Sequence, residues 1–247
     1  LAGPKPSIYS GDASLYVLRV GVELLRAGRA DFLYLSLTDY MQHKYAPEAL
    51  ESREFYRAID AEIGRLLDLG AIVGITADHG MNAKCNGDGS PNVIYLETEL
   101  GREFGDGCRV ICPITDPYVV HHGALGSAVT VYLPDNLDAQ KIANWIAALD
   151  GVTEVHNRES AVAKLELPGD RIGDLFVLSD RDWVLGRTPE HHDLAKLEGT
   201  LRSHGGRYEE TVPFLISEPL NAKYAALAKG DPRNFDIFDF VCNGTQP

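Results

Sequence analysis

The sequence predicts an α/β fold in which buried strands alternate with amphipathic helices. A strand pattern at residues 31–37 is followed by a helical pattern that begins near Pro47 and ends at Gly70. A second strand pattern follows at residues 71–77, an apolar run rich in β-branched residues that is typical of a strand buried on both faces. Such a strand–helix–strand unit favours two parallel strands joined by a right-handed crossover.

The composition is that of a protein with a substantial core. Of 247 residues, 45% are hydrophobic and 24% are charged, which suits one α/β domain with an insertion or two small domains. The formal net charge of −13 disfavours nucleic acid and anionic membranes as partners, because both need a basic face. No apolar run approaches the ~20 residues that span a bilayer, and no signal peptide is visible.

The cysteine content indicates a reducing environment. Four cysteines are too few for a disulfide framework, so we expect free thiols and a cytoplasmic location. Cys108 and Cys112 lie four residues apart in a segment with a strand pattern, which favours buried structural thiols over metal ligands. The chain begins at Leu1 in a linker-like stretch, so we expect it to be the later portion of a longer protein.

The other elements follow in chain order. A first helix is expected from the N-cap residue Ser10 to Gly28. The helix after Pro47 is expected to bury a stripe formed by Tyr56, Ile59, Ile63 and Leu66. Further strands are expected at residues 92–96, 127–133, 152–156, 172–179 and 211–217, helices at residues 135–150 and 234–243, and a short element at residues 160–167.

The pattern of predicted elements changes after Cys112, which suggests an insertion. The β-α-β pattern within residues 113–168 is interpreted as a small α+β cap. The core would then consist of residues 1–112 and 169–247. A cap over the strand ends could select a substrate by its shape.

Five residues offer metal ligands. Asp78 and His79 follow the strand at residues 71–77, where open α/β sheets place their ligands. Asp39 and His43 follow the strand at residues 31–37 and are four residues apart, so one helical turn puts them on the same face. His204 precedes two glycines, which allow a tightly turned ligand loop.

Each group also has a simpler explanation. Asp39 could cap a helix beside a surface histidine, and Asp78-His79 could be an ordinary polar strand end. Together, however, they provide two carboxylates and three imidazoles, ligands that suit zinc. One tetrahedral zinc needs only three or four ligands, so five suggest a site for two metal ions.

The motifs resemble those of the alkaline phosphatase superfamily, which includes nucleotide pyrophosphatases, cofactor-independent phosphoglycerate mutases and phosphonoacetate hydrolases. The resemblance rests on residues 38–43 (TDYMQH), 77–82 (ADHGMN) and 202–217 (RSHGGRYEETVPFLIS), and it extends over nearly the whole chain. The first two motifs are most similar to those of the phosphonoacetate hydrolase family. The fold so implied is a three-layer α/β/α core with an inserted cap.

The resemblance also implies a bimetallic zinc site. One zinc would take Asp39, His43 and His204, and the other would take Asp78 and His79. The family's nucleophilic threonine and a further aspartate ligand would belong to an earlier segment, so we assign no catalytic nucleophile in this chain. Asp39 and His204 would border the substrate, and a homodimer is a further expectation.

The leading hypothesis is therefore a zinc-dependent enzyme that hydrolyses phosphonoacetate, a small anionic phosphonate, to acetate and phosphate. A bound metal would supply the positive charge that such a substrate needs. A phosphodiesterase or nucleotide pyrophosphatase on the same scaffold is one alternative, and an inactive metal-binding fragment is another. A mutase is less favoured, because the chain shows no large second transferase domain.

Several other polar residues are not assigned to the site. Adjacent side chains on a strand point to opposite faces, so the pairs His121-His122 and His191-His192 are interpreted as loop or surface residues. Asp116 and Asp193 are expected to face solvent. Arg202 and Arg207 flank His204 and could meet an anion, although surface ion pairs are the expectation for both.

Overall fold

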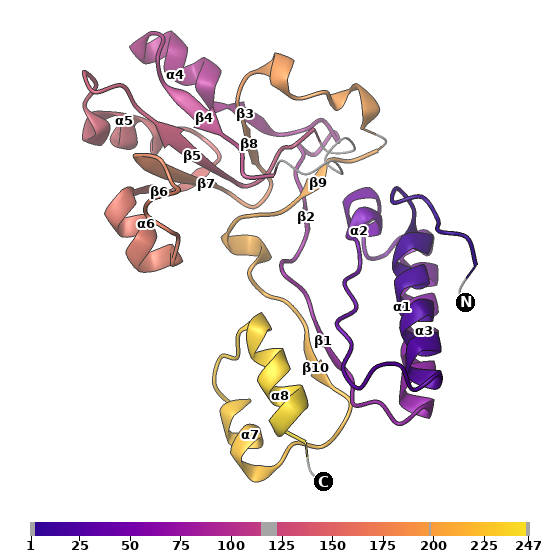
Figure 1. Cartoon of the computed structure of the whole chain (residues 1–247). Helices are drawn as coiled ribbons and strands as arrows, with labels where there is room; N and C mark the ends of the chain where they lie inside the picture. The colour runs from indigo at the N-terminus through magenta and orange to yellow at the C-terminus, as the bar shows by residue number, and fades with distance from the viewer. Residues whose placement is uncertain (1–2, 115–122, 198, 246–247) are drawn as a thin grey trace. The chain divides into compact units, whose positions relative to one another are not determined.

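The structure is a computed structural model that describes residues 3–114, 123–197 and 199–245 (Figure 1). The chain divides into two compact units. Unit 1 consists of Leu1–His79 and Thr211–Pro247, and unit 2 consists of Gly80–Glu210. No described helix has both the length and the apolar composition that a membrane-spanning helix needs.

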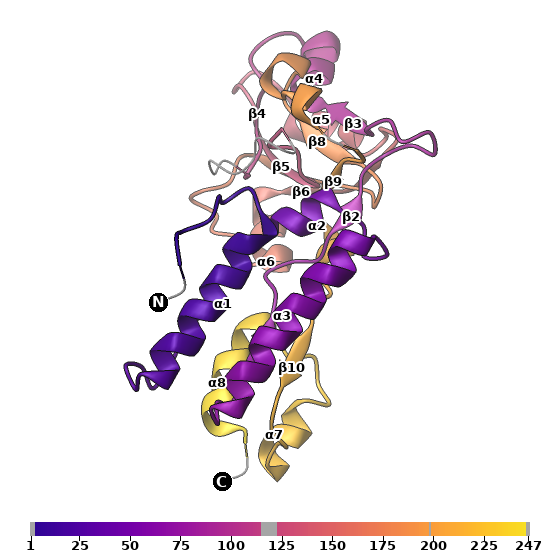
Figure 2. The ribbon, with the colours of Figure 1, turned by 90° about the vertical axis from the view of Figure 1, so that its right-hand side faces the viewer.

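Unit 1 contains two long helices that lie side by side (Figure 2). Helix α1 (Gly11–Arg26) begins after Ser10, as predicted, and Gly28 follows its end with a φ of +59°, a conformation that glycine adopts without strain. Helix α3 (Leu50–Asp68) buries Phe55, Glu62 and Leu66. Of the predicted stripe, Leu66 is buried and Ile59 and Ile63 are half-buried, whereas Tyr56 is exposed and its neighbour Phe55 is buried instead.

The described residues of unit 1 form a sheet of two strands. Strand β1 (Gly74–Thr76) pairs antiparallel with β10 (Phe214–Ile216). Helix α8 (Ile237–Asn243) packs against β1, and a Cβ at Gly74 would lie 2.4 Å from Cγ2 of Val241. Glycine at this position therefore permits the close approach of the helix. Unit 1 also contains α2 (Tyr40–Lys44), α7 (Ala222–Leu227) and a 3₁₀ turn at Asn234–Asp236.

The predicted parallel strand pair in unit 1 was wrong. Residues 32–39 form no strand ladder, and the partner of β1 is the antiparallel strand β10. Residues 71–77 are not buried on both faces either, because Ile72 is exposed and β1 is half-buried. A local sequence pattern specifies an extended chain, but pairing depends on which other segment lies beside it.

Unit 2 is built on a four-stranded antiparallel sheet with the order β4-β5-β7-β6. These strands are Arg109–Ile111, Ala128–Tyr132, Leu175–Ser179 and Val152–Asn157, respectively. The helices of this unit are α4 (Leu96–Phe104), α5 (Ala139–Ile146) and α6 (Arg158–Leu165). Buried aliphatic side chains from α4, α5 and the sheet form one continuous core.

Two further ladders complete unit 2. Strand β3 (Val93–Tyr95) pairs parallel with β8 (Val184–Gly186), and β2 (Asn82–Ala83) pairs antiparallel with β9 (Arg202–Ser203). Among its described residues, 3₁₀ turns lie at Pro189–His191, Leu194–Lys196 and Arg207–Glu209. The ladder β2–β9 joins segments about 120 residues apart, and it brings the chain after His79 beside the chain before His204.

The predicted cap falls inside unit 2. Strand β5, which lies within residues 113–168, pairs with both β4 and β7, which lie outside these bounds. The segment therefore shares one sheet with its neighbours, and its bounds as a cap stay a prediction. The expected helix at residues 135–150 is shorter, because its N-cap is Asp138, whose carboxylate accepts from Gln140 N and Lys141 N.

The cysteines are free thiols in the structure. Cys108 and Cys112 flank β4, so the expected strand is present. Cys112 is buried and Cys108 is half-buried. The residues Asp116, His121 and His122 lie outside the described part of the chain.

Candidate metal centre

Asp39 and His43 lie on one turn of a short helix. Asp39 is the N-cap of α2, and the backbone N–H of His43 donates to its carbonyl oxygen at 3.0 Å. This turn brings Nε2 of His43 to 3.0 Å from Oδ2 of Asp39. The His43 side chain is buried, while Asp39 remains partly exposed. The buried Ser14 of α1 fixes the preceding segment, because its Oγ accepts from Thr38 N at 3.0 Å.

Asp78 and His79 follow β1, and the His79 imidazole lies near the same carboxylate. Nε2 of His79 lies 3.8 Å from Oδ2 of Asp39 and 3.6 Å from Oδ1 of Asp78. Asn234 holds the end of this segment, because its Nδ2 donates to the carbonyl of Ala77 at 3.2 Å. Four of the five predicted ligands therefore converge within unit 1.

These residues fit a zinc ion by chemistry and by spacing. Two ligand atoms that each lie ~2.0–2.1 Å from a tetrahedral zinc are separated by roughly 3.3 Å. The separations within the two assigned pairs, 3.0 Å for Asp39–His43 and 3.6 Å for Asp78–His79, bracket that value. Imidazole nitrogen and carboxylate oxygen are both common zinc ligands. The cluster can also form hydrogen bonds between carboxylate and imidazole, which would keep the rings oriented before a metal binds.

His204 belongs to unit 2, on the turn that follows β9. Its carbonyl oxygen accepts from Ser127 N at 2.8 Å, which fixes the backbone at the ligand itself. The next residue, Gly205, has a φ of +105°, a conformation that residues with a side chain rarely adopt. The expected glycine-dependent turn is therefore present.

Other predicted polar residues are explained by local contacts. His192 was expected to be a loop or surface residue, and it lies in a loop but is buried. One of its ring nitrogens accepts from Arg187 N, and the other lies 2.6 Å from the Gly123 carbonyl. Burial lowers its pKa, so the ring is neutral and structural. His191 is exposed beside Thr188, and Asp193 is exposed and caps the turn at Leu194–Lys196.

The two arginines beside His204 differ from each other. Arg207 forms ion pairs with Glu154 at 2.8 Å and with Glu210 at 2.6 Å, in agreement with the expected pairing role. Arg202 is buried in β9, so the expected surface position was wrong for this residue.

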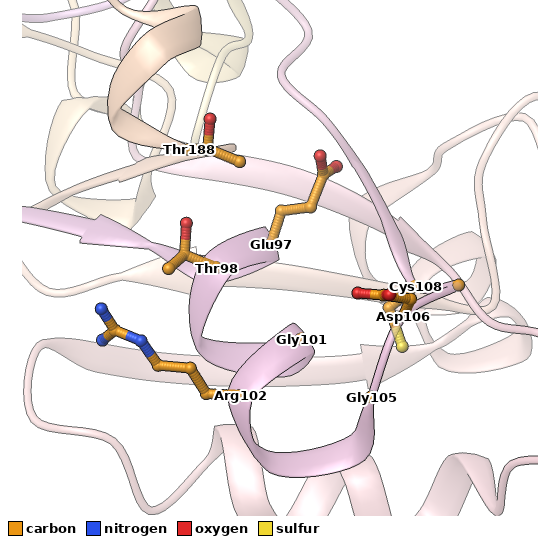
Figure 3. A pocket seen from close by; sticks show the side chains of 9 residues that line it. Glu97, Thr98, Gly101, Arg102, Gly105, Asp106, Cys108 and Thr188 are labelled. Atoms are coloured by element: carbon orange, nitrogen blue, oxygen red, sulfur yellow. The ribbon is translucent and has the colours of Figure 1, made fainter.

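A hollow of about 420 Å³ lies elsewhere in unit 2 (Figure 3). Its lining includes Glu97, Thr98 and Arg102 of α4 together with Cys108 and Thr188. The Glu97 carboxylate already accepts hydrogen bonds from Val110 N at 2.7 Å and from the Arg187 guanidinium at 3.2 Å. The lining contains none of the five predicted metal ligands, and we assign no chemistry to it.

Sequence reasoning missed a buried ion pair in unit 2. Nζ of Lys84 lies 3.0 Å from Oε1 of Glu209, and both side chains are almost inaccessible to solvent. A charged residue on a short segment gives no local sign of burial, and its partner lies 125 residues away in sequence. The available signal was proximity in sequence, because each residue lies five positions beyond a predicted histidine ligand, His79 or His204.

Comparisons with known proteins agree with this fold. The sequence profile of the type I phosphodiesterase / nucleotide pyrophosphatase family matches residues 20–207. Phosphonoacetate hydrolase from Sinorhizobium meliloti 1021, solved with phosphonoformate and with phosphonoacetate, is 47% identical with a TM-score of 0.87, covering 98% of this chain and 58% of that chain. This chain thus spans about three fifths of the length of that hydrolase.

Two more distant structures show the fold alone. Murine ectonucleotide pyrophosphatase / phosphodiesterase 5 is 16% identical with a TM-score of 0.55, covering 93% of this chain and 60% of that chain. A mutant of alkaline phosphatase PafA is 15% identical with a TM-score of 0.50, covering 85% of this chain and 44% of that chain. The predicted alkaline-phosphatase-like α/β fold and the resemblance to phosphonoacetate hydrolases are confirmed.

Proposed function

The chain belongs to the type I phosphodiesterase / nucleotide pyrophosphatase family, and from this membership we propose that it is a zinc-dependent hydrolase of phosphonoacetate. The observation that carries the proposal is the convergence of Asp39, His43, Asp78 and His79 in a chain that is 47% identical to a phosphonoacetate hydrolase. Structures of that relative contain phosphonoacetate and phosphonoformate, which are small anionic phosphonates.

We assign the ligands to two zinc ions. Asp39, His43 and His204 would hold one ion, and Asp78 and His79 would contribute to the other. The geometry within unit 1 supports four of these residues. The assignment of His204 is supported by its motif, Ser203-His204-Gly205-Gly206, and by the fixed turn on which it lies.

The reaction divides a phosphonate between two anionic products. Bound zinc would lower the pKa of a hydroxyl nucleophile and neutralise charge on the phosphoryl oxygens. The nucleophile forms a bond to phosphorus, the carbon–phosphorus bond breaks, and its electron pair goes to carbon. The neighbouring carboxylate delocalises this charge, and protonation of the carbon gives acetate. Water then releases the phosphoryl group as phosphate. Asp39 and His204 would border the reacting group.

The overall charge is consistent with local rather than general attraction of the substrate. With a net charge of −13, the protein repels anions except where metal ions or basic groups reverse the potential. We further propose that the protein works in the cytoplasm, since its four cysteines are free, and that it acts as a homodimer.

The test is phosphate release from phosphonoacetate by the purified full-length protein, including the segment expected to carry the nucleophile, after loading with zinc. Turnover should stop when a chelator is added and return with zinc. His43→Ala should lower kcat/KM by at least about 100-fold, because a ligand is lost. His191→Ala, which removes an exposed histidine from unit 2, is the matched control and should leave turnover unchanged. Equal losses in the two variants would contradict the ligand assignment.

A phosphodiesterase is the second candidate, favoured by the family profile itself. The same metal site would serve a nucleotide phosphodiester, because only the substrate pocket distinguishes the two reactions. The zinc-loaded protein should therefore be offered both substrates under identical conditions. A higher kcat/KM for the diester would replace the phosphonate proposal. A zinc content of two ions per chain, measured by elemental analysis, would support the bimetallic assignment in either case.

A further inference from the structure

A buried carboxylate organises the turn that carries His204. Glu209 is 2% exposed, yet both of its oxygens are used. Oε1 accepts from Lys84 Nζ at 3.0 Å and from Asn82 Nδ2 at 2.6 Å, while Oε2 accepts from Gly206 N at 2.9 Å. The last bond reaches the backbone two residues beyond His204. Three donors on one carboxylate fix both its position and its orientation.

Lys84 is fully buried and completes this network. Its Nζ also donates to the carbonyl of Arg181 at 2.6 Å. Burial lowers the pKa of Lys84, while the charge of Glu209 acts in the opposite direction. Lys84 directly follows β2, the strand that comes after the ligand His79 in the chain. Asn82 and Lys84 are two residues apart in this extended segment, so their side chains point to the same side.

Glu209 also touches the chain next to the other ligand motif. Its carbonyl oxygen accepts from Gly80 N at 2.7 Å, and Gly80 is the residue that follows His79. Its side chain meanwhile bonds to Gly206 N. One residue therefore holds the backbone beside both histidine motifs.

The turn has little freedom to change. A Cβ at Gly206 would lie 2.9 Å from Cβ of Ser127, and Ser127 N in turn donates to the His204 carbonyl. On the far side, Arg207 is paired with Glu154. The backbone on either side of the His204 side chain is thus constrained by a strand neighbour, a buried charge and an ion pair.

We propose that Glu209 and Lys84 are positioning residues that set the His204 imidazole for metal binding. The inference rests on the proposed zinc site, and neither residue is a ligand or touches substrate. Stability alone explains the pair poorly, because apolar residues of similar volume often stabilise a protein as well as a buried ion pair does. A carboxylate that must accept from Gly206 N, however, cannot be replaced by an apolar side chain.

The first test measures zinc affinity directly. Glu209→Gln keeps the shape of the side chain but loses its charge and one acceptor. Zinc affinity, measured by competition with a chromogenic chelator, should weaken by about 10- to 100-fold, the usual effect of losing a hydrogen-bonding partner that supports a ligand. The matched control is Glu97→Gln, which removes a paired carboxylate elsewhere in unit 2. Its zinc affinity should stay within about twofold of the parent, a ratio small beside the ~10-fold lower bound expected for Glu209→Gln.

The second test asks whether the effect passes through His204. His204→Ala should weaken zinc binding, and Glu209→Gln should add nothing further in that background, because coupled residues are not additive. Thermal unfolding curves of each variant identify the temperatures at which it is folded, and zinc titrations are carried out below them. If Glu209→Gln does not fold, Glu209→Asp is the alternative, because it retains the charge but is too short to reach Gly206 N. It should lower the zinc affinity, and this effect should also depend on His204.

The possible results separate this inference from the proposed function. If His204→Ala lowers the zinc affinity but the Glu209 variants do not, the positioning role is wrong and the proposed metal site is still supported. An equal loss from Glu209→Gln with and without His204 would also overturn the positioning role. If His204→Ala leaves zinc affinity unchanged, the ligand assignment in the proposed function fails, and the positioning role fails with it.

Discussion

The two units differ in how they treat their apolar side chains. Unit 2 encloses them, and both hydrophobic core clusters of the described residues lie there. Unit 1 leaves many at the surface, and it contains thirteen of the fifteen large hydrophobic side chains that are exposed in the described chain. Phe32 and Tyr34, for example, are 57% and 72% exposed, and their rings lie 6.4 and 5.9 Å from the ring of Phe238.

The same difference extends to the predicted metal ligands. His204 in unit 2 lies on a turn held by the buried pair Lys84–Glu209. In unit 1 the carboxylates are more accessible, with Asp78 86% exposed, and Asp39 and Asp78 contact the imidazoles that would share the ion with them. Unit 2 therefore holds its ligand turn through a buried ion pair, whereas in unit 1 hydrogen bonds to Thr38 N and to the Ala77 carbonyl hold the backbone beside more accessible carboxylates. This difference predicts unequal responses to mutation and to metal removal.

The largest difference is expected for charged side chains. Lys84→Met leaves the Glu209 carboxylate buried without its cation and should lower the free energy of unfolding by about 3–5 kcal/mol. Arg19→Ala in unit 1 should cost roughly 0–1 kcal/mol, because Arg19 is half-exposed and Glu62 keeps Arg65 at 2.6 Å. Urea denaturation followed by tryptophan fluorescence reports on unit 2, which contains both tryptophans, Trp145 and Trp183. Far-UV circular dichroism, which follows the long helices α1 and α3, reports on unit 1 in the same titration. Similar losses of stability in the two variants would show that buried and exposed ion pairs contribute equally in the two units.

Core truncation should show the next largest difference. Leu100 of α4 is fully buried in unit 2, and Leu100→Ala should cost about 2–5 kcal/mol. Leu67 of α3 is 41% exposed in unit 1, so Leu67→Ala should change stability by roughly 0.5 kcal/mol or less. Both changes remove the same atoms from a helix and introduce the same residue. Far-UV circular dichroism follows the long helices of unit 1 during denaturation, and a large cost at Leu67 would show that unit 1 has a core of its own.

Removal of metal should loosen unit 1 more than unit 2. Saturating zinc at ~100 times its dissociation constant adds roughly 2.7 kcal/mol to the stability of the state that binds it. Amide hydrogen exchange at residues 39–45 and 77–79 should therefore be faster in the chelator-treated protein than in the zinc-loaded protein. The turn at residues 203–209 should change less, because its hydrogen bonds involve only protein groups. Equal increases in both segments would show that metal, and not the buried pair, orders that turn.

The sequence predicted the local features of the site better than its long-range partners. The spacing of Asp39 and His43 places them on one helical turn, and Asp78-His79 follows β1 as expected, so these contacts could be inferred from neighbours in the chain. The strand expected at residues 31–37 did not form a ladder, because a ladder requires a partner that no local pattern specifies.

Helices followed the same rule. The start of α1 was predicted because the N-cap and the apolar spacing are local signals. The buried face of α3 was predicted correctly at Leu66 but not at Tyr56, because this face also depends on α1, whose Arg19 pairs with Glu62. The burial of Lys84 with Glu209 could not be predicted for the same reason, since charged residues are usually exposed and only the fold brings this pair together.

The smallest difference is expected for the reactivity of two cysteines. Burial raises the pKa of Cys112 in unit 2 to about 11, so only about 0.1% of this thiol is ionised at pH 8. Cys242 in unit 1 is exposed and should react first with a thiol-specific disulfide reagent in the native protein, with Cys112 reacting only after urea unfolds unit 2. Cys242→Ser should remove the fast phase and leave the slow one.

The raised pKa of Cys112 also sets the sign of a pH effect. The unfolded thiol ionises near pH 8.5, so between that pH and about 11 the folded state holds a proton that the unfolded state has lost. Stability from this group is therefore complete below about pH 8.5 and falls as the pH rises through 11. Cys112→Ala should reduce the decrease in the free energy of unfolding between about pH 8.5 and 11, measured by tryptophan fluorescence, whereas Cys242→Ser should not. If neither variant alters the slope, the buried thiol does not govern the alkaline unfolding of unit 2.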